Sequence, residues 1–333
     1  MAHIRVLISE THDPWFNLAT EDYIFREMDP SQHILFLWRN VDTIVIGRYQ
    51  NPWGECNLKA MEEDGVKLAR RQSGGGAVYQ DLGNTNFTFM SSRSSYDKSR
   101  NNRIITGAIG RFGIHAQPSG RNDILVEGRK ISGSAFKLTQ DRAFHHGTLL
   151  IRADLSRVPK YLTPDSKKLV SKGIKSVKSR VANLSEYNEK IDHENLSEAV
   201  IEEFFKTYGQ RCEPEILDHE TLKKIPHLNE YFEKLSDWNW RFGKTPDFSH
   251  HMVERFDWGR MELFINTNRG EITEVRIYSD TLMPELVEHL MEDLKNIPYE
   301  GGAIQTQIRR TADTLPEARG YLREFSDWLV SKI

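Results

Sequence analysis

The stretch LARRQSGGGAVYQDLGNTNFTF, residues 68–89, decides the fold class of this chain. Strand-like residues lead into Gly74, Gly75 and Gly76, and an extended segment follows them. No Gly-Lys-Ser/Thr follows the glycines, which excludes a P-loop, and no helix opens after them, which excludes the glycine turn of a dinucleotide-binding unit. Strands and helices around this stretch do not alternate regularly. This arrangement favours an α+β fold over a doubly wound parallel sheet.

The three glycines suggest a place where the backbone approaches another group closely. Residues without a Cβ permit positive φ angles, and their N–H groups can form an anion-binding nest. Arg70 and Arg71 stand directly before them, and arginine suits bidentate recognition of phosphate. Alternation along a strand places one arginine toward such a site and the other away from it. The same pattern also fits an ordinary glycine-rich turn with solvated arginines.

A second candidate cluster lies in SGRNDILVEGRKISGSAFK, residues 119–137. The Glu-Gly pair at 127–128 predicts a hairpin turn, which places Lys130 on the returning strand among small residues. A long cation beside small residues suits an anionic ligand, and the alternative is a solvated surface lysine. Asn122 and Asp123 form either a common turn or, through the carboxylate, a site for Mg²⁺ bound to phosphates.

The remaining periodicities predict the other elements and two domains. A composition change at 238–251 places a linker at 245–252, between a domain of residues 1–244 and a small α+β domain of residues 253–333. For the second domain we expect a three-stranded meander followed by two helices. In the first we expect helices and strands by their apolar spacing: helices at 16–28, 58–64, 102–113 and 193–209, a hairpin of 34–38 with 43–47, and strands at 85–90 and 145–151.

Bulk composition narrows the class of protein. Of 333 residues, 45 are basic and 48 acidic, a net charge of −3 that argues against broad nucleic-acid binding. The two cysteines form no disulfide framework or zinc pattern. No secretory signal or apolar run of about 20 residues is present, so we expect a soluble cytoplasmic protein without membrane or nucleic-acid partners.

Three further residues have open interpretations. His145 and His146 are adjacent on a predicted strand, so they face opposite sides of it and cannot chelate one metal ion together. One of them lines a pocket, or both are half-buried structural histidines. Cys56, in WGECN, is the one cysteine in the region that carries the candidate chemistry, and it is either a structural thiol or a nucleophile.

Taken in order, RRQSGGGAVYQDLGNTNFTF, SGRNDILVEGRKISGSAFK and FHHGTLL resemble the lipoate–protein ligases of the bacterial single-chain type. ISETHDPWFNLATEDYIFREM and LFLWRNVDTIVIGRYQNPWGECN resemble the same family, so the resemblance covers nearly the whole chain. It implies the fold shared with biotin–protein ligases, which is related to the catalytic core of class II aminoacyl-tRNA synthetases. It also implies a small α+β C-terminal accessory domain.

The activity implied by the resemblance is an amide-forming ligation in two steps. Lipoate and ATP, with Mg²⁺ as activator and no prosthetic group, give lipoyl-adenylate and pyrophosphate. The lipoyl group then passes to one lysine of an apo lipoyl domain of a 2-oxoacid dehydrogenase or of the glycine-cleavage H protein, which amounts to lipoate salvage. We expect a monomer.

The resemblance also implies site residues. Lys130 would touch both the lipoate carboxylate and the phosphate, and it is the expected catalytic residue. Asp123 would hold Mg²⁺ with ATP. ATP and adenylate would contact Arg71, Gly76, Ala77, Val78, Tyr79, Asn122, Asp123, Lys130, Ser132 and Ala135. Lipoate would contact Lys130, Arg70, Ser73, Gly75 and His146, with its apolar tail in a slot lined by parts of WFNLA, TIVIG and HHGTLL. The turn VEGRK is shorter than expected for close relatives, whereas RKISGSA is intact.

Two other functions fit parts of the sequence. An octanoyl- or lipoyltransferase on the same fold would use a cysteine nucleophile, for which Cys56 is the candidate. A non-catalytic adenylate-binding protein would bind ATP and lipoate without releasing pyrophosphate.

Overall fold

The computed structural model describes residues 3–162, 181–242, 250–268 and 270–333, which form two compact units. The first unit comprises Met1–Ile46, Pro52–Gln72 and Ala77–Phe242, and the second comprises Gly47–Asn51, Ser73–Gly76 and Gly243–Ile333. Two short segments from the N-terminal part of the chain therefore belong to the same unit as the C-terminal residues. Within the described residues, no helix is long and apolar enough to cross a membrane.

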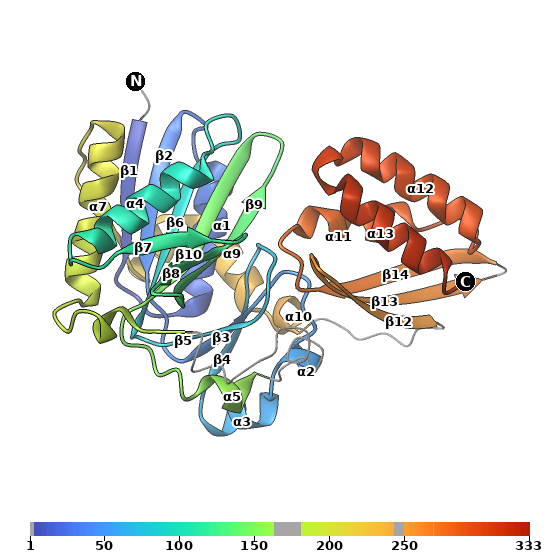
Figure 1. Cartoon of the computed structure of the whole chain (residues 1–333), viewed down its shortest axis with the longest axis horizontal. Coiled ribbons are helices and arrows are strands. Elements are labelled where there is room, and N and C mark those ends of the chain that lie inside the picture. The colour runs from blue at the N-terminus through green and yellow to red at the C-terminus, as the bar shows by residue number, and fades with distance from the viewer. Residues whose placement is uncertain (1–2, 163–180, 243–249, 269) are drawn as a thin grey trace. The chain divides into compact units, whose positions relative to one another are not determined.

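The first unit is built on an eight-stranded sheet with the order β11-β1-β2-β6-β10-β9-β8-β7 (Figure 1). Neighbours are parallel from β11 to β2 and antiparallel from β2 to β7. The strands are β1 (His3–Ser9), β2 (Gln32–Trp38), β6 (Asn84–Ser92), β7 (Ala116–Ser119), β8 (Asp123–Val126), β9 (Arg129–Leu138), β10 (Arg142–Leu150) and β11 (Glu215–Leu217).

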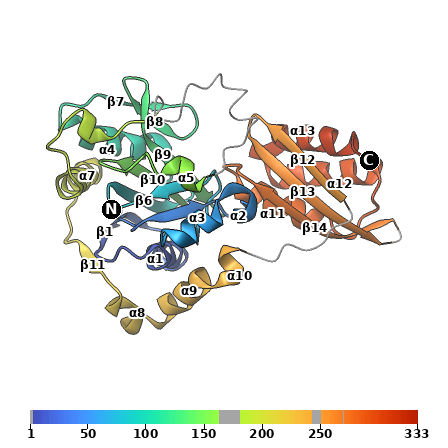
Figure 2. The ribbon, with the colours of Figure 1, turned by 90° about the horizontal axis from the view of Figure 1, so that it is seen from below.

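Helices cover both faces of this sheet, α4 and α7 on one and α1 and α9 on the other (Figure 2). Side-chain alternation along the strands supplies the two cores: Phe87 and Phe89 pack with α4 and α7, whereas Met90 packs with α1. The helices are α1 (Pro14–Glu27), α2 (Pro52–Glu55), α3 (Leu58–Glu63), α4 (Lys98–Gly110), α5 (Val158–Tyr161), η2 (Leu184–Glu186), α7 (His193–Tyr208), α8 (Glu220–Lys224), α9 (Pro226–Ser236) and α10 (Trp238–Arg241).

The predicted hairpin of 34–38 with 43–47 is wrong. β3 (Thr43–Ile46) belongs to a separate sheet, β4-β3-β5, with β4 (Lys67–Arg70) and β5 (Val78–Gln80). The polar connection is fixed by buried amides instead of a tight turn: Asn17 Nδ2 donates to Asn40 Oδ1 at 3.0 Å, and Asn40 Nδ2 donates to Gln80 Oε1 at 2.7 Å. This network redirects the chain from one sheet to the next.

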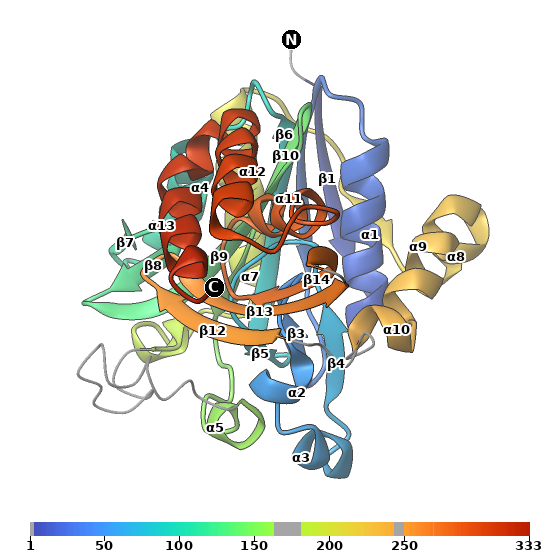
Figure 3. The ribbon, with the colours of Figure 1, turned by 90° about the vertical axis from the view of Figure 1, so that its right-hand side faces the viewer.

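The second unit contains the predicted meander, β12 (His250–Phe256), β13 (Gly259–Asn268) and β14 (Glu271–Ser279), with helices on one face of it (Figure 3). The prediction of two helices is wrong, because three α-helices are present: α11 (Pro284–Asp293), α12 (Gly301–Thr314) and α13 (Arg319–Val330), with η3 (Pro316–Ala318) before the last. The unpredicted α12 begins with two glycines, but it buries Ile304 and Ile308 at helical spacing. Strand β12 also includes residues 250–252 of the expected linker.

Buried His145 makes the stability of the first unit depend on pH. Its side chain lies among the rings of Phe87, Phe89 and Phe136, and burial lowers its pKa to about 3. Below the unfolded pKa of 6.5 the unfolded chain binds a proton that the folded chain excludes, so stability falls as the pH falls from about 6.5 toward 3. Lowering the pH from 7.5 to 5.5 is expected to cost wild type about 1.4 kcal/mol more than His145→Phe.

Urea unfolding of both proteins at the two pH values measures this difference. Half-buried His193, whose pKa is also lowered by burial, to about 4, is present in both proteins, so its contribution cancels. Identical pH slopes for wild type and His145→Phe would contradict the assignment.

Candidate active site

Lys130 stands at the start of β9, directly after the tight turn from β8. Glu127 and Gly128 both have positive φ angles, 51° and 78°, as a two-residue hairpin turn of this type requires. The Lys130 ammonium lies 2.7 Å from Asp123 Oδ1, and the two side chains are 36% and 35% exposed. The predicted hairpin is therefore confirmed, and it brings a solvent-accessible cation and carboxylate together.

Small residues make room for this lysine. A Cβ at Gly133 would lie 2.8 Å from Lys130 Nζ and would displace the flexible end of the lysine from its present position. A Cβ at Gly147, on the neighbouring strand β10, would lie 2.5 Å from the ring of Phe87. The glycines of SGSA and HHG thus allow close packing of side chains over both faces of β9 and β10.

The polar residues around Lys130 have different environments. Asn122 fixes the loop to β9, because its Nδ2 donates to the Ser134 carbonyl oxygen at 3.1 Å and its own carbonyl oxygen accepts from the Ser134 N–H at 2.7 Å. Ser132 is fully buried, and its hydroxyl has no hydrogen-bond partner within the part of the chain that is described. Ala135 is buried opposite His146 in the sheet register.

Asp123 is the one residue that the sequence analysis predicts to hold Mg²⁺. Within residues 3–162, 181–242, 250–268 and 270–333, no three His, Cys, Asp or Glu side chains are grouped to hold a metal ion. Mg²⁺ is commonly held by one or two carboxylates together with phosphate oxygens, so a single carboxylate fits an ion that arrives with ATP. The Asp123 carboxylate is partly exposed and meets that condition.

His146 belongs to a buried chain of hydrogen bonds under α1. Its Nδ1 lies 2.8 Å from Glu21 Oε1, which also accepts from Thr88 Oγ1 at 2.6 Å. Trp38 Nε1 donates to the same threonine hydroxyl at 3.1 Å. Sequence reasoning missed Glu21; the available signal was a carboxylate on the buried face of an apolar helix, since such a group requires polar partners.

The two arginines before the glycines point to different partners. Arg70 donates to the carbonyl oxygens of Trp240 and Arg241, at 2.8 Å and 2.7 Å, and so binds the end of α10. Arg71 donates to the Val45 carbonyl oxygen at 3.0 Å. Burial lowers the Arg71 pKa to about 10, which the charge of Glu21 partly opposes. The guanidinium of Arg71 is thus a fixed positive charge inside the first unit.

The glycine segment itself lies in the second unit, where it packs against backbone. Of the three glycines, only Gly75 has a positive φ, 91°, and its N–H donates to the Thr281 carbonyl oxygen at 2.7 Å. A Cβ at Gly74 would lie 2.1 Å from that oxygen. The Ser73 carbonyl oxygen accepts from the Arg48 N–H at 2.9 Å. Close approach of another chain segment is therefore a sufficient reason for Gly74, independent of any ligand.

The end of the glycine stretch leads into β5. Ala77 and Val78 are partly buried, and Tyr79 is buried with its hydroxyl donating to Asp42 Oδ1 at 3.0 Å. Burial raises the pKa of the Tyr79 phenol. This short strand is held by pairing with β3 and by the tyrosine hydroxyl.

Cys56 is not placed as a nucleophile. It is 5% exposed in a small core with Tyr79 and Tyr161, and burial raises its thiol pKa to about 12. At neutral pH the thiol therefore stays protonated, whereas a nucleophilic cysteine acts as the thiolate.

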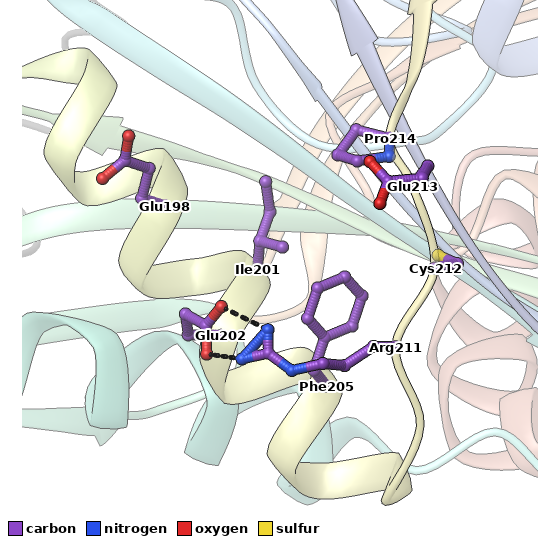
Figure 4. Close-up of a pocket in the computed structure, with 8 residues that line it drawn as sticks. All are labelled: Glu198, Ile201, Glu202, Phe205, Arg211, Cys212, Glu213 and Pro214. Atoms are coloured by element: carbon purple, nitrogen blue, oxygen red, sulfur yellow. Dashed lines mark hydrogen bonds and ion pairs between the residues drawn. The ribbon is translucent and has the colours of Figure 1, made fainter.

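A separate cavity of about 630 Å³ lies between α7 and residues 211–214, away from all the predicted site residues (Figure 4). Ile201 and Phe205 contribute apolar surface to it, and Arg211 pairs with Glu202 at 2.5 Å across one side. None of the expected chemistry involves this cavity.

Comparison with known proteins gives the family. Residues 13–205 match the lipoyl protein ligase A/B catalytic domain, and residues 245–329 match the bacterial lipoate protein ligase C-terminus. The chain is 50% identical over 335 residues to lipoate-protein ligase A of Psychrobacter cryohalolentis, covering 99% of each sequence.

Three solved structures are similar. P. falciparum LipL1 in complex with lipoate has a TM-score of 0.88 at 38% identity, covering 98% of this chain and 99% of that one. The bi-partite lipoate protein ligase from Thermoplasma acidophilum, described with its E2 lipoyl domain, has a TM-score of 0.65 at 26% identity, covering 75% and 100%. Lipoate-protein ligase A bound with ATP has a TM-score of 0.63 at 25% identity, covering 72% and 99%.

The fold and the similarities together define an enzyme of the ligase class that forms a carbon–nitrogen bond. The chain belongs to the lipoate–protein ligase family and has its α+β catalytic fold and its C-terminal domain. The resemblance read from the glycine and lysine motifs is thereby confirmed.

Proposed function

We propose that this ligase converts lipoate and ATP to lipoyl-adenylate and pyrophosphate, and then transfers the lipoyl group to a lysine of apo lipoyl domains. Those domains would belong to 2-oxoacid dehydrogenases and to the glycine-cleavage H protein, in a salvage pathway. The observation that carries the proposal is the position of Lys130, a partly exposed cation next to Asp123 and above Gly133. The lipoate, ATP and lipoyl-domain complexes of the similar proteins support the three substrates.

The first step brings two anions together. A lipoate carboxylate oxygen attacks the α-phosphorus of ATP, and the bond from that phosphorus to the bridging oxygen breaks, so negative charge moves onto pyrophosphate. Fixed positive charge at the reacting atoms stabilises this change. We assign that role to Lys130, with Arg71 as a second buried cation and with Asp123 holding Mg²⁺, which would neutralise phosphate charge.

The remaining site residues are assigned from the resemblance of their motifs to the family. We assign Gly76, Ala77, Val78 and Tyr79, with Asn122, Ser132 and Ala135, to the adenylate, and Ser73, Gly75 and His146 to lipoate. Arg70 would act through α10, since its guanidinium donates to carbonyl oxygens there. In this assignment Glu21 is a positioning residue, because its carboxylate fixes the ring of His146.

An acceptor assay tests the proposed function. Wild-type protein, an apo lipoyl domain, lipoate, ATP and Mg²⁺ should give lipoylated acceptor, seen by mass spectrometry, and omission of ATP should abolish the product. Acceptor modification without ATP would contradict the ligase mechanism.

Replacing Cys56 separates the ligase from a cysteine-dependent transferase. Cys56→Ala is expected to retain ATP-dependent activity within about twofold, because no enzyme nucleophile takes part, while losing roughly 1–2 kcal/mol of stability through the lost burial of the sulfur. Initial rates and urea unfolding measure the two effects. Loss of activity in a folded Cys56→Ala protein would support the transferase.

We also propose a cytoplasmic monomer with a catalytic domain of residues 1–244, a linker at 245–252 whose last three residues begin β12, and an accessory domain of 253–333. The two compact units and the separate family matches of residues 13–205 and 245–329 support the division into two domains. Light scattering of the purified chain tests the monomer.

A further inference from the structure

A network of charged and phenolic side chains joins α5 to the nucleotide-side strand β5. Its hub is Tyr161, which is fully buried at the end of α5. The Tyr161 hydroxyl donates to Asp64 Oδ2 at 2.5 Å and accepts from Arg157 Nη2 at 2.7 Å. Lys160 also pairs with Asp64. The network thus fastens α5 to the residue that follows α3.

Arg157 extends the network toward the site. Its Nη1 forms an ion pair with Asp42 Oδ2, and the other oxygen of that carboxylate accepts from the Tyr79 hydroxyl at 3.0 Å. The guanidinium carbon also lies 5.6 Å from the centroid of the Tyr79 ring and 5.4 Å from that of Tyr161. Arg157 therefore holds Tyr79 by two routes, through Asp42 and through its ring face.

The strand that carries Tyr79 has few main-chain restraints, and its side chains add others, since Gln80 is hydrogen-bonded to Asn40 and Asn86. β5 has three residues and pairs with β3 alone, through Val45–Val78, Ile44–Tyr79 and Thr43–Gln80. A three-residue edge strand has few main-chain hydrogen bonds, so side-chain contacts decide its position. Because residues 76–79 are assigned to the adenylate, a shift of β5 would displace nucleotide contacts.

We propose that Arg157 is a positioning residue for the nucleotide, which fixes Tyr79 and β5 through Asp42 without touching the substrates. This inference rests on the proposed function. It predicts a raised KM for ATP and an unchanged KM for lipoate, because His146 lies on the large sheet and Glu21 on α1, whereas Tyr79 lies on the separate sheet β4-β3-β5.

Lipoate-dependent exchange of labelled pyrophosphate into ATP measures both substrates. Arg157→Gln is expected to raise KM for ATP about tenfold, as for loss of a coupled hydrogen-bond network, with KM for lipoate unchanged. Arg157→Lys, which keeps the charge but loses the planar fork, is expected to recover part of the loss. Tyr79→Phe combined with Arg157→Gln should raise KM for ATP less than the product of the single effects, because both remove one coupled contact.

Lys160→Ala is the matched control. It removes an exposed ion pair from the same helix and leaves Arg157 and its contacts with Asp42 and Tyr161 in place, so KM for ATP should stay at the wild-type value. An unchanged KM for ATP in Arg157→Gln would overturn the proposal. Equal rises in both KM values, with a lowered melting temperature, would also overturn it by showing a general structural role.

Two provisions keep the test decisive. If Arg157→Gln does not fold, Asp42→Asn removes the ion pair while leaving an oxygen to accept from Tyr79, and it must raise KM for ATP alone. If wild type shows no lipoate-dependent exchange, the proposed function fails, whereas normal wild-type exchange with normal Arg157 variants refutes the positioning role only.

Discussion

Lys130→Ala is expected to lower kcat/KM for lipoate-dependent pyrophosphate release by about 10²–10³-fold, the cost of removing one group that stabilises charge in the transition state. The lysine and its one described ion-pair partner, Asp123, are both partly exposed, so solvent can reach the carboxylate once the ammonium is removed. The loss should therefore come from chemistry, with the melting temperature close to that of wild type. Initial rates at saturating ATP and varied lipoate measure the effect.

Arg129→Ala is the control for this prediction. Arg129 is the preceding residue of the same strand, but its guanidinium donates to Glu186 at 2.7 Å and to the Val181 carbonyl oxygen at 2.9 Å. Removing it deletes a cation of equal charge and should leave the rate of pyrophosphate release within about twofold of wild type. The free energy of unfolding should fall by at most about 1 kcal/mol, as is typical when an exposed ion pair is lost. Wild-type rates in Lys130→Ala, or equal losses in both variants, would contradict the catalytic assignment.

Gly74→Ala is expected to destabilise the second unit by about 3 kcal/mol. The new methyl group would lie 2.1 Å from the Thr281 carbonyl oxygen and 3.2 Å from backbone atoms of Leu282, and neither can rotate away. Overpacking typically lowers the free energy of unfolding by about 1–3 kcal/mol, and a clash with backbone lies at the upper end because the chain itself must move. Unfolding monitored by tryptophan fluorescence or calorimetry measures the loss.

Gly302→Ala is the matched substitution. Gly302 lies in α12, and a Cβ there meets no atom within 4 Å, so the helix should gain about 0.5–1 kcal/mol from the lower entropy of alanine. A Gly74→Ala protein as stable as wild type would show that residues 281–282 do not press on the glycine segment. The glycines would then need a ligand-based explanation.

The sequence correctly predicted those turns and helix ends that depend on residues close together in the chain. The Glu127-Gly128 turn placed Lys130 on the returning strand, as the structure shows, because a two-residue turn with positive φ angles fixes how its hairpin begins. Helix α7 ends where predicted, at Gly209 with φ 64°, because a left-handed residue satisfies the last carbonyl groups.

The errors arose where distant residues decide the structure. The polar link at 39–42 has the composition of a turn, but buried contacts of Asn40 with Asn17 and Gln80 send it to another sheet. Helix α12 was missed because its glycines lower local propensity, whereas burial of its apolar face outweighs that cost.

The candidate site likewise contains residues that motifs identify and residues that only the fold brings together. The motifs indicated Lys130 and His146, but Glu21 and Arg157 belong to the site region only through contacts across more than 70 residues of sequence. No spacing rule connects such residues before the fold is known. The sequence correctly predicted that the backbone at Gly74 approaches another group closely. The group expected there was a ligand, whereas in the structure the nearest group is the Thr281 carbonyl oxygen.

The central claim, that this chain activates lipoate by adenylation, is tested most directly by exchange of labelled pyrophosphate into ATP without any acceptor protein. The account predicts exchange by the wild-type protein that requires both lipoate and Mg²⁺ and that Lys130→Ala reduces at least about 10²-fold. Absence of lipoate-dependent exchange by folded wild-type protein, together with acceptor lipoylation from a thioester donor in the absence of ATP, would contradict it.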